Sequence, residues 1–466
     1  MSIQCANLLL FFYLCKYIHD FCEKYQYFLF FCQKMTTFAV EMSLRSLVKS
    51  SGVRNFTKLL SANVVAQVIG LVVYPILTRM YAPEDFGLLN LFMSIGGVLA
   101  ILSTAEYYYA IVLPKEEKDA ENVFGVGVIW LIATTVLIGL SVGFAKPISI
   151  LFKSPNLASY YWMMPLYVFA MGAWNLLNYW YIRHKEYNPI SRYQVSQNLL
   201  SAGGKLGMGW GGIFQGGMIY SVVLAPLISL ASSWLCARKT LLPACRRISW
   251  QAVCEQATVY RNFPCFVLPR SFVNMLAGQM PVLLLTPFFG GEAVGFLSLA
   301  ILLGYTPIGT ITRAIYQVMY RHTMEQVHEQ KPIGQIFRKF LLSASAIIIP
   351  VFVGLWFVLP ELTAWLLGPE WHVSGEYIRW MLPWLYVSLL SCSINYLFDV
   401  FMKQKMGLIF EVLLALFRVL GLMIGVWRSD FVLAIALYSM GTAVALVIQI
   451  IWMLKQVRQY DRSIAA

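Results

Sequence analysis

Apolar segments of about twenty residues recur along the chain, separated by shorter polar stretches. Several contain no charged residue at all: 59–78, 87–105, 122–145, 340–360, 380–398 and 431–454. At about 1.5 Å per residue, an α-helix of this length crosses the roughly 30 Å of hydrocarbon in a bilayer. These segments lack the alternation of a membrane β-barrel. We therefore expect helices, which satisfy their own backbone hydrogen bonds.

Other apolar segments tolerate one charge or are long enough to be divided. With these included, the pattern predicts an all-α polytopic membrane protein with about 12 transmembrane helices. They are expected at residues 59–80, 87–108, 123–145, 160–182, 190–212, 216–236, 266–289, 294–316, 340–360, 378–400, 407–427 and 431–454. The composition agrees, because 59% of the residues are hydrophobic and only 12% are charged, with a mean hydropathy of +0.67. Soluble domains do not have this composition.

Lysine and arginine gather at alternate connections and at both ends of the predicted bundle. The opposite connections carry only Arg79, Lys146, Lys153, Arg379 and Arg428. Because basic residues are retained on the cytoplasmic side, we expect both termini in the cytoplasm and the protein in the cytoplasmic (inner) membrane. The net charge of +13 mostly reflects this bias, so we expect no nucleic-acid partner.

The chain repeats itself. Residues 78–91 read TRMYAPEDFGLLNL and residues 286–299 read TPFFGGEAVGFLSL. With a constant offset of 208 positions, Thr78 matches Thr286 and Gly87 matches Gly295. Two apolar segments can be alike by chance, but the matched polar and glycine positions favour duplication. The sequence thus predicts two pseudo-symmetric six-helix bundles related by an axis along the membrane normal.

The repeat and the basic stretches set the expected domain boundaries. We expect an N-terminal bundle at residues 42–236, a cytoplasmic linker at 237–262, a C-terminal bundle at 263–454 and a cytoplasmic tail at 455–466. Residues 1–41 fit poorly, because charges divide their apolar stretches into pieces too short to span. We expect them to be an extension outside the fold, with Met35 or Met42 as the natural start.

Catalytic and metal-binding motifs are missing from the sequence. No two histidines are spaced H-x-x-x-H and no two cysteines C-x-x-C, so we expect neither a metal nor a cofactor, and no enzyme activity. The glycine-rich stretch SAGGKLGMGWGG lacks the nucleotide-binding pattern G-x-x-x-x-G-K-[ST]. Its Gly203, Gly207 and Gly211 share one helix face, which favours close helix packing, with a hinge as the alternative.

Charges inside the predicted helices are the strongest functional signal, because each costs about 3 kcal/mol or more at the bilayer centre. Arg418 lies eleven residues into the helix predicted at 407–427 and is too deep to reach either surface easily. Lys205, Arg270 and Arg313 are the other cationic candidates. We expect Arg418 to face a watery cavity and bind an anion. The alternative is structural neutralisation by an acid on a neighbouring helix.

Three acids also lie in or near the predicted helices: Glu106, Asp399 and Glu411. Glu411 precedes Arg418 by seven residues, so it shares that helix face at a distance of about 10 Å along the axis. These acids are candidates for ion coupling or for a structural role, and the structural role is favoured because they lie near the helix ends.

Three stretches carry a family resemblance. They are LLSANVVAQVIGLVVYPILTRMYAPEDFGLLNL, FPCFVLPRSFVNMLAGQMPVLLL followed by GGEAVGFLSLA, and LFRVLGLMIG. From about residue 48 onwards, the chain resembles the polysaccharide exporters of the multidrug/oligosaccharidyl-lipid/polysaccharide superfamily, especially the flippases for O-antigen, which carry the lipid-linked oligosaccharide used to build lipopolysaccharide.

The resemblance implies two six-helix bundles around a central cavity that opens to one side of the membrane at a time. It implies an undecaprenyl-pyrophosphate-linked oligosaccharide as substrate, for O-antigen, capsule or exopolysaccharide. The anionic headgroup would be held by cationic residues, here Arg418, Arg270, Lys205 and Arg313. It also implies a monomeric transporter that works beside other glycan-assembly membrane proteins.

Two other functions remain open from the sequence. A drug or cation antiporter of the same superfamily would share the fold, but it needs a membrane carboxylate, and residues 59–78 contain none. A membrane glycan polymerase or ligase usually needs a sizeable outer loop. The longest one expected here, residues 361–377, is short, and its Glu370 and His372 form no recognisable catalytic set.

Overall fold

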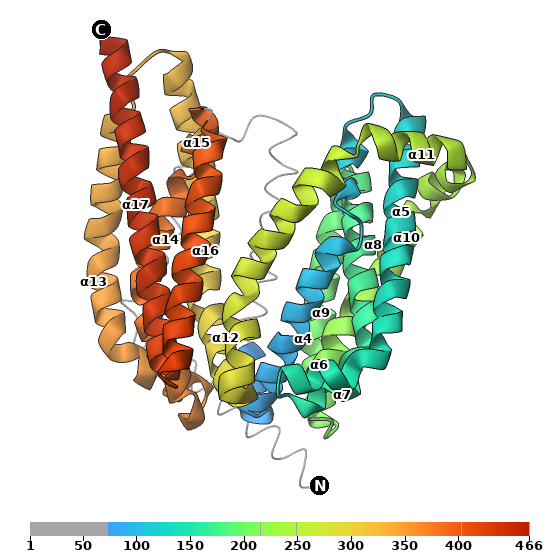
Figure 1. Ribbon diagram of the computed structural model, residues 1–466, viewed down its shortest axis with the longest axis horizontal. Coiled ribbons are helices and arrows are strands. Elements are labelled where there is room, and N and C mark those ends of the chain that lie inside the picture. The colour runs from blue at the N-terminus through green and yellow to red at the C-terminus, as the bar shows by residue number, and fades with distance from the viewer. Residues whose placement is uncertain (1–72, 215, 248, 402, 466) are drawn as a thin grey trace. The chain divides into compact units, whose positions relative to one another are not determined.

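The computed structural model describes residues 73–465 except 215, 248 and 402. The described residues belong to one compact unit, Thr57–Ala466. Residues 1–41, which we expect to be an extension, lie outside the described residues. Most of the first predicted helix, 59–80, also lies outside them. The described secondary structure is helical throughout (Figure 1). An all-α polytopic membrane fold is therefore confirmed.

Long helices and shorter helical elements follow one another along the chain. The long helices are α4 (Pro83–Leu102), α5 (Glu117–Ser141), α8 (Met164–Arg183), α9 (Tyr187–Trp210), α10 (Gly217–Arg247), α11 (Trp250–Val259), α12 (Leu268–His328), α13 (Gly334–Leu367), α14 (His372–Ile394), α16 (Gln404–Trp427) and α17 (Phe431–Ala465). The short ones are η1 (Tyr107–Val112), η2 (Val142–Phe144), α6 (Ala145–Leu151), α7 (Pro155–Tyr160), η3 (Tyr161–Met163), η4 (Phe263–Val267), η5 (Pro369–Trp371) and α15 (Leu397–Val400).

Eight helical stretches of the described chain are long and apolar enough to cross a membrane. One of them contains two predicted spans, because α12 continues through residues 266–289 and 294–316 and bends at Gly290, whose φ of 85° and ψ of 175° are not helical. The predicted break at this point is confirmed, and the total of about 12 spans stays a prediction.

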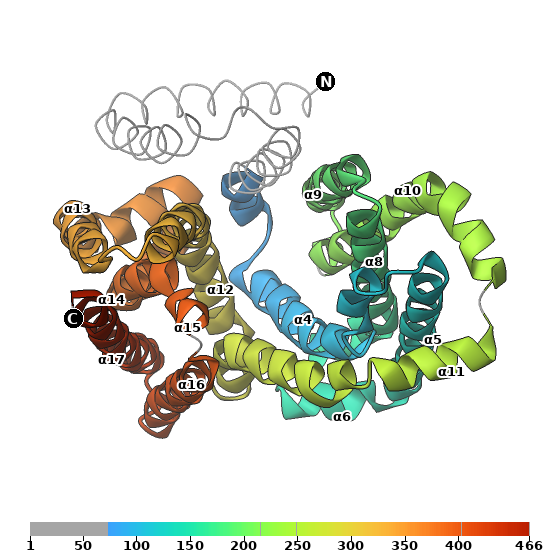
Figure 2. The same cartoon turned by 90° about the horizontal axis from the view of Figure 1, so that it is seen from above.

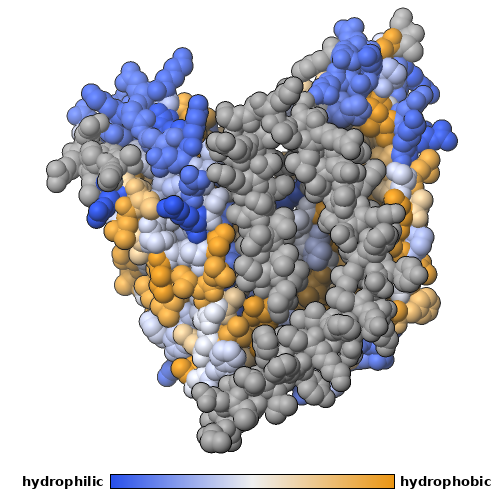
Figure 3. All heavy atoms as spheres, turned by 180° about the vertical axis from the view of Figure 1, so that it is seen from behind, coloured by the Kyte–Doolittle hydropathy of each residue, from blue (hydrophilic) through white to orange (hydrophobic). Residues whose placement is uncertain are grey.

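Exposed apolar side chains show which surfaces face lipid. Leu342, Val353 and Phe357 of α13 are exposed, as are Val136 and Leu140 of α5. Figure 3 shows apolar side chains over the middle of the visible helices and hydrophilic side chains gathered at one end. Apolar surface of this extent is stable against hydrocarbon rather than water.

Two predicted helix ends are wrong. The second span was expected to reach residue 108, but α4 ends at Leu102, and Ala105 and Glu106 then adopt left-handed conformations with φ of 45° and 63°. Glu106 therefore lies beyond the helix. Likewise, the tenth span was expected to reach residue 400, but α14 ends at Ile394 and Asp399 belongs to the short α15.

The internal repeat is visible in the helices themselves. Element η3 leads directly into α8, which begins at Met164, and η5 leads into α14, which begins at His372, again 208 positions later. The glycines of the repeat make a reciprocal contact. A Cβ atom on Gly87 would collide with the carbonyl oxygen of Gly291, and one on Gly295 would collide with that of Pro83. Because Pro83 and Gly291 are themselves equivalent under the offset, the contact has the two-fold character of a symmetric interface.

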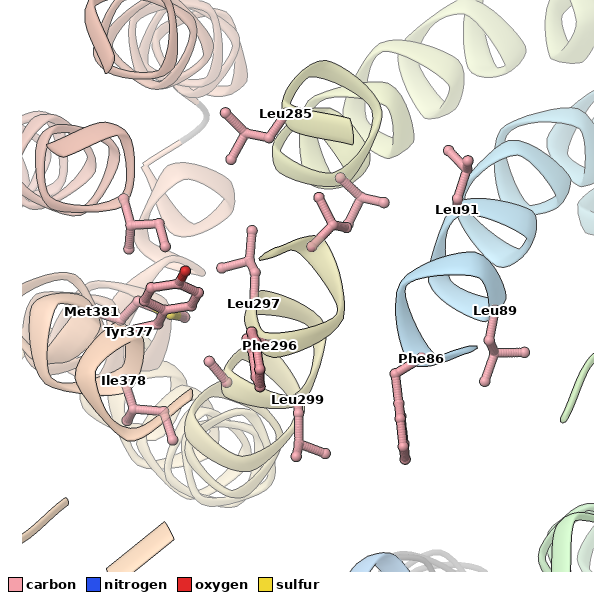
Figure 4. Close-up of a cluster of buried hydrophobic side chains, with 14 of the residues drawn as sticks. Phe86, Leu89, Leu91, Leu285, Phe296, Leu297, Leu299, Tyr377, Ile378 and Met381 are labelled. Atoms are coloured by element: carbon pink, nitrogen blue, oxygen red, sulfur yellow. The ribbon is translucent and has the colours of Figure 1, made fainter. Parts of the chain in front are cut away.

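Around this contact the two repeats share one hydrophobic core, which Figure 4 shows with side chains from α4, α12 and α14. Trp371 packs its ring edge-on to Phe86 and Phe296, at centroid distances of 5.0 and 5.4 Å. Its indole Nε1 donates to the carbonyl oxygen of Thr78 (3.2 Å), and the Thr78 hydroxyl donates to that of Leu367 (2.8 Å). The buried polar groups at this junction are thus paired.

From the glycine contact, α4 and the first arm of α12 run antiparallel, side by side in both views (Figures 1 and 2). Gly87 contacts Gly291, and seven residues later Ser94 Oγ donates a hydrogen bond to Gln279 Oε1 (2.8 Å). Residue numbers thus increase along α4 and decrease along the part of α12 that faces it. The remaining long helices pack in two groups, α5 with α8 and α10, and α14 with α13 and α17. This arrangement brings the connection after α4 close to the beginning of α12.

Candidate anion-binding site

Arg418 lies on α16 and is half-buried. Its guanidinium carbon is 5.7 Å from the ring centroid of Tyr438 on α17, a cation–π distance. Its buried Nε has no hydrogen-bond partner among the described residues. No carboxylate in the described part of the chain forms an ion pair with it. The alternative of a neutralising acid therefore finds no support in the residues described.

A cavity of about 320 Å³ lies between α12 and α14. It is lined by Tyr305, Ile308, Gly309, Thr312, Arg313 and Tyr316 of α12 and by Ser388 and Cys392 of α14. Tyr305 and Cys392 both lie within electrostatic range of Arg418, and Tyr305 also lies within range of Arg313. Arg313 therefore lines this cavity, which we call the Tyr305 cavity, and Arg418 lies near it, within electrostatic range of two lining residues.

A series of contacting aromatic rings leads from Arg418 to Tyr305, a lining residue of the cavity. Tyr305 stacks on Trp384 of α14, with centroids 5.3 Å apart and an interplanar angle of 13°. Trp384 in turn meets the edge of Tyr438 at 5.5 Å, and Tyr438 is the ring beside Arg418. Rigid rings hold their neighbours at low entropic cost. The aromatic side chains thus form a rigid, packed series between Arg418 and Tyr305 of the cavity.

Two of the candidate acids, Glu411 and Asp399, lie outside the cavity lining but within electrostatic range of it. Glu411 is exposed and lies within electrostatic range of Cys392, and the exposed Asp399 lies within range of Tyr316. The cavity offers cationic, hydroxyl and aromatic groups. Among its lining residues, no base stands beside Ser388 or Cys392 to activate either as a nucleophile.

Arg270 belongs to a different cluster. It is exposed at the beginning of α12, and its charge acts on Glu106, which is 2% exposed. Ser271 and Tyr108 are within hydrogen-bonding reach of the same carboxyl group. The antiparallel packing of α4 and α12 thus joins two residues that the sequence presented separately.

Lys205 is half-buried on α9, and its backbone carbonyl accepts a hydrogen bond from the hydroxyl of Tyr81 (2.7 Å). No contact among the described residues connects it to Arg418. The predicted close packing at Gly203, Gly207 and Gly211 is wrong for the residues described. The added Cβ of Gly203 or Gly207 would meet nothing within 4 Å, and that of Gly211 only its own helix.

The sequence did not single out Tyr305, Trp384 or Tyr438. Aromatic residues are frequent in this chain, at 15% of all positions, and most of them pack in the core. Only the packing of three helices shows that Tyr305 lines a cationic cavity and that Trp384 and Tyr438 pack behind it.

A family model described as "Polysaccharide biosynthesis protein" matches residues 76–376, more than half of the chain and a segment that includes Tyr305 and Arg313. The chain belongs to this polysaccharide biosynthesis protein family. A curated relative, the succinoglycan biosynthesis transport protein ExoT of Rhizobium meliloti (strain 1021), is 21% identical over 307 residues. These residues cover 64% of this chain and 59% of ExoT, so the match spans less than two thirds of that relative.

Solved structures show the same fold for this member of the polysaccharide biosynthesis family. An inward-facing multidrug resistance MATE transporter of the MOP superfamily aligns with a TM-score of 0.65 at 15% identity, covering 85% of this chain and 96% of that one. The lipid II flippase MurJ in an inward closed conformation aligns with a TM-score of 0.61 at 12% identity, covering 86% and 89%. The fold is thus that of the multidrug/oligosaccharidyl-lipid/polysaccharide superfamily.

Glu106 gives the folded protein a pH dependence that can be measured. Burial raises the pKa of its carboxyl above the ordinary value of 4.5, although hydrogen bonds from Tyr108 and Ser271 and the charge of Arg270 oppose the rise. The folded state therefore holds this proton more tightly than the unfolded state. This contribution to stability is complete below pH 4.5 and is lost as the pH rises through the folded pKa.

We expect the melting temperature of Glu106→Gln in detergent to fall less than that of the wild type as the pH is raised from 4.5 to neutral. The control is Glu116→Gln, since Glu116 is exposed on the same connection. Parallel pH profiles for wild type and Glu106→Gln would contradict the assignment.

Proposed function

We propose that this protein is a flippase for an undecaprenyl-pyrophosphate-linked oligosaccharide, the repeat unit of an O-antigen, capsule or exopolysaccharide. The single observation that carries the proposal is the cationic Tyr305 cavity, which Arg313 lines and Arg418 influences from nearby, with no carboxylate paired to either among the described residues. Membership of a polysaccharide biosynthesis family supports it, as does a relative named as a transport protein.

The charge of the cavity favours an anionic ligand. An arginine stays charged at all physiological pH values and offers parallel hydrogen bonds that match phosphate oxygens. Its burial without an acid costs free energy, which an anion would recover on binding. In this proposal a pyrophosphate binds in the Tyr305 cavity beside Arg313 and is also attracted by the nearby charge of Arg418. Hydroxyl groups of Tyr305, Thr312 and Ser388 add neutral hydrogen bonds.

In this proposal the protein moves its cargo and makes or breaks no covalent bond. The headgroup enters from the cytoplasm, binds at the Tyr305 cavity and leaves on the other side when the two bundles rock around it. The lipid tail stays in the bilayer. Both termini face the cytoplasm, and the bundles occupy residues 42–236 and 263–454, with a linker at 237–262. It acts as a monomer and hands its cargo to other glycan-assembly proteins.

The likeness to a drug transporter leaves an antiporter as the rival with the same fold. A site for cationic drugs would place a carboxylate at its centre. Glu411 and Asp399 instead lie exposed at the margin of the Tyr305 cavity. A glycan polymerase or ligase is the rival from another class. It would form polymer when the purified protein is supplied with lipid-linked repeat units in liposomes.

Deletion of the gene tests the proposal in cells. We expect lipid-linked repeat units to accumulate on the cytoplasmic face, where a membrane-impermeant reagent reaches them only after the cells are opened. A plasmid copy of the wild type should clear them. An unchanged lipid-linked glycan profile in the deletion strain would remove the flippase function.

A further inference from the structure

Three tyrosine rings form a cluster in the N-terminal half, away from the residues of the Tyr305 cavity. Tyr108 and Tyr109 of η1 have ring centroids 4.3 Å apart. Both also meet Tyr179 of α8, at 5.0 and 5.1 Å. Tyr109 is 39% exposed, so part of its ring is open to a ligand.

The hydroxyl groups of this cluster form a chain that ends at a carboxylate. Tyr179 is within hydrogen-bonding reach of Tyr109, Tyr109 of Tyr108, and Tyr108 of Glu106. Glu106 itself is 2% exposed, and its Oε2 atom has no hydrogen-bond partner among the described residues. The carboxyl group is therefore the buried end of the chain, and Tyr109, at the other side of Tyr108, is the part open to a ligand.

The backbone holds Glu106 in this place. Ala105 and Glu106 both have left-handed conformations, which cost free energy in residues with a side chain. The next residue is anchored, because the Tyr107 hydroxyl donates to the carbonyl oxygen of Ala257 (3.1 Å). The nearby positive charge of Arg270 stabilises the ionised carboxyl group of Glu106. It does not account for three adjacent rings with one partly exposed.

We propose that Glu106, Tyr108, Tyr109 and Tyr179 form a subsite for a neutral pyranose of the transported glycan. The apolar C–H face of the sugar packs on the Tyr109 ring, and the sugar hydroxyls exchange hydrogen bonds with the tyrosine hydroxyls, which the buried Glu106 holds in place through Tyr108. The subsite rests on the proposed function and adds recognition of the sugar to recognition of the pyrophosphate.

Binding at the sugar subsite and at the Tyr305 cavity can be measured independently on the purified full chain. The probes are inorganic pyrophosphate and the oligosaccharide released from the source strain's own lipid-linked glycan. We expect Tyr109→Ala to weaken oligosaccharide binding at least about tenfold, which is about 1.4 kcal/mol, and to leave pyrophosphate binding unchanged. Arg418→Ala should do the reverse. Trp162→Ala, which removes another exposed aromatic ring, is the control and should change neither.

Two conservative variants control for loss of binding that is caused by misfolding. Tyr109→Phe keeps the ring and should retain most of the oligosaccharide affinity, and Glu106→Gln keeps the shape but loses the charged acceptor and should weaken it. Oligosaccharide affinity in Tyr109→Ala equal to that of the wild type would overturn the subsite. Wild-type protein that binds pyrophosphate but no oligosaccharide would also overturn it while leaving the proposed function in place. The proposed function fails separately, in the deletion strain.

Discussion

Replacing Arg418 with alanine is expected to abolish export of the surface glycan while the protein level stays normal. The substitution removes a half-buried guanidinium near the Tyr305 cavity and with it the charged hydrogen bonds that we propose it makes to phosphate. Such bonds contribute about 1.5–3 kcal/mol each, so binding of inorganic pyrophosphate should weaken roughly 10- to 100-fold. Surface glycan in cells and calorimetry on purified protein measure the two effects.

Two matched variants sharpen this prediction. Arg418→Lys keeps the positive charge but loses the planar, two-pronged donor, so we expect partial export. Arg428→Ala removes an exposed arginine at the end of the same helix, where it lies 5.1 Å from the ring of Trp427, and should export normally. Normal surface glycan in Arg418→Ala would rule out the role assigned to this residue.

Substitution of either glycine at the reciprocal contact is expected to have the second large effect. In Gly87→Ala the new methyl group would collide with the carbonyl of Gly291, and in Gly295→Ala with that of Pro83. Backbone cannot move aside as a flexible side chain does. Overpacking of this kind costs about 1–3 kcal/mol or more, so the folded yield and the melting temperature in detergent should both fall.

The two variants should lose similar amounts of stability, because the repeat makes their surroundings equivalent. Gly139→Ala of α5 is the control, since no described residue stands within 4 Å of its added methyl group. It should be neutral or slightly stabilising, because alanine favours a helix over glycine. Equal melting temperatures for Gly87→Ala and Gly139→Ala would contradict the close contact.

The hydrophobic pattern predicted the helical fold well because a bilayer imposes one simple rule on every crossing segment. It even placed the interruption near Gly290 within the long α12. Helix ends were harder to predict. Residues 103–108 are mostly uncharged and apolar, yet two left-handed residues stop the chain from continuing α4. No local pattern reveals that turn, since neither Ala105 nor Glu106 is a residue that favours it.

The candidate site was predictable only in part. The depth of Arg418 in an apolar segment identified it from the sequence alone. Its neighbours could not be identified in this way, because Arg313 lies on another helix and the tyrosine and tryptophan residues of the cavity resemble ordinary core residues. For the same reason Arg270 and Glu106 were named separately. Their contact depends on the antiparallel packing of α4 and α12.

The central claim is that this protein carries a pyrophosphate-linked glycan across the bilayer by means of the Tyr305 cavity. Its most direct test is purified protein in liposomes that contain undecaprenyl-pyrophosphate oligosaccharide labelled on the sugar. With wild type, labelled lipid from the inner leaflet should become accessible to an impermeant quencher outside, and with Arg418→Ala it should stay protected as in protein-free liposomes. Wild-type liposomes that protect the inner-leaflet label as fully as protein-free ones would contradict the account.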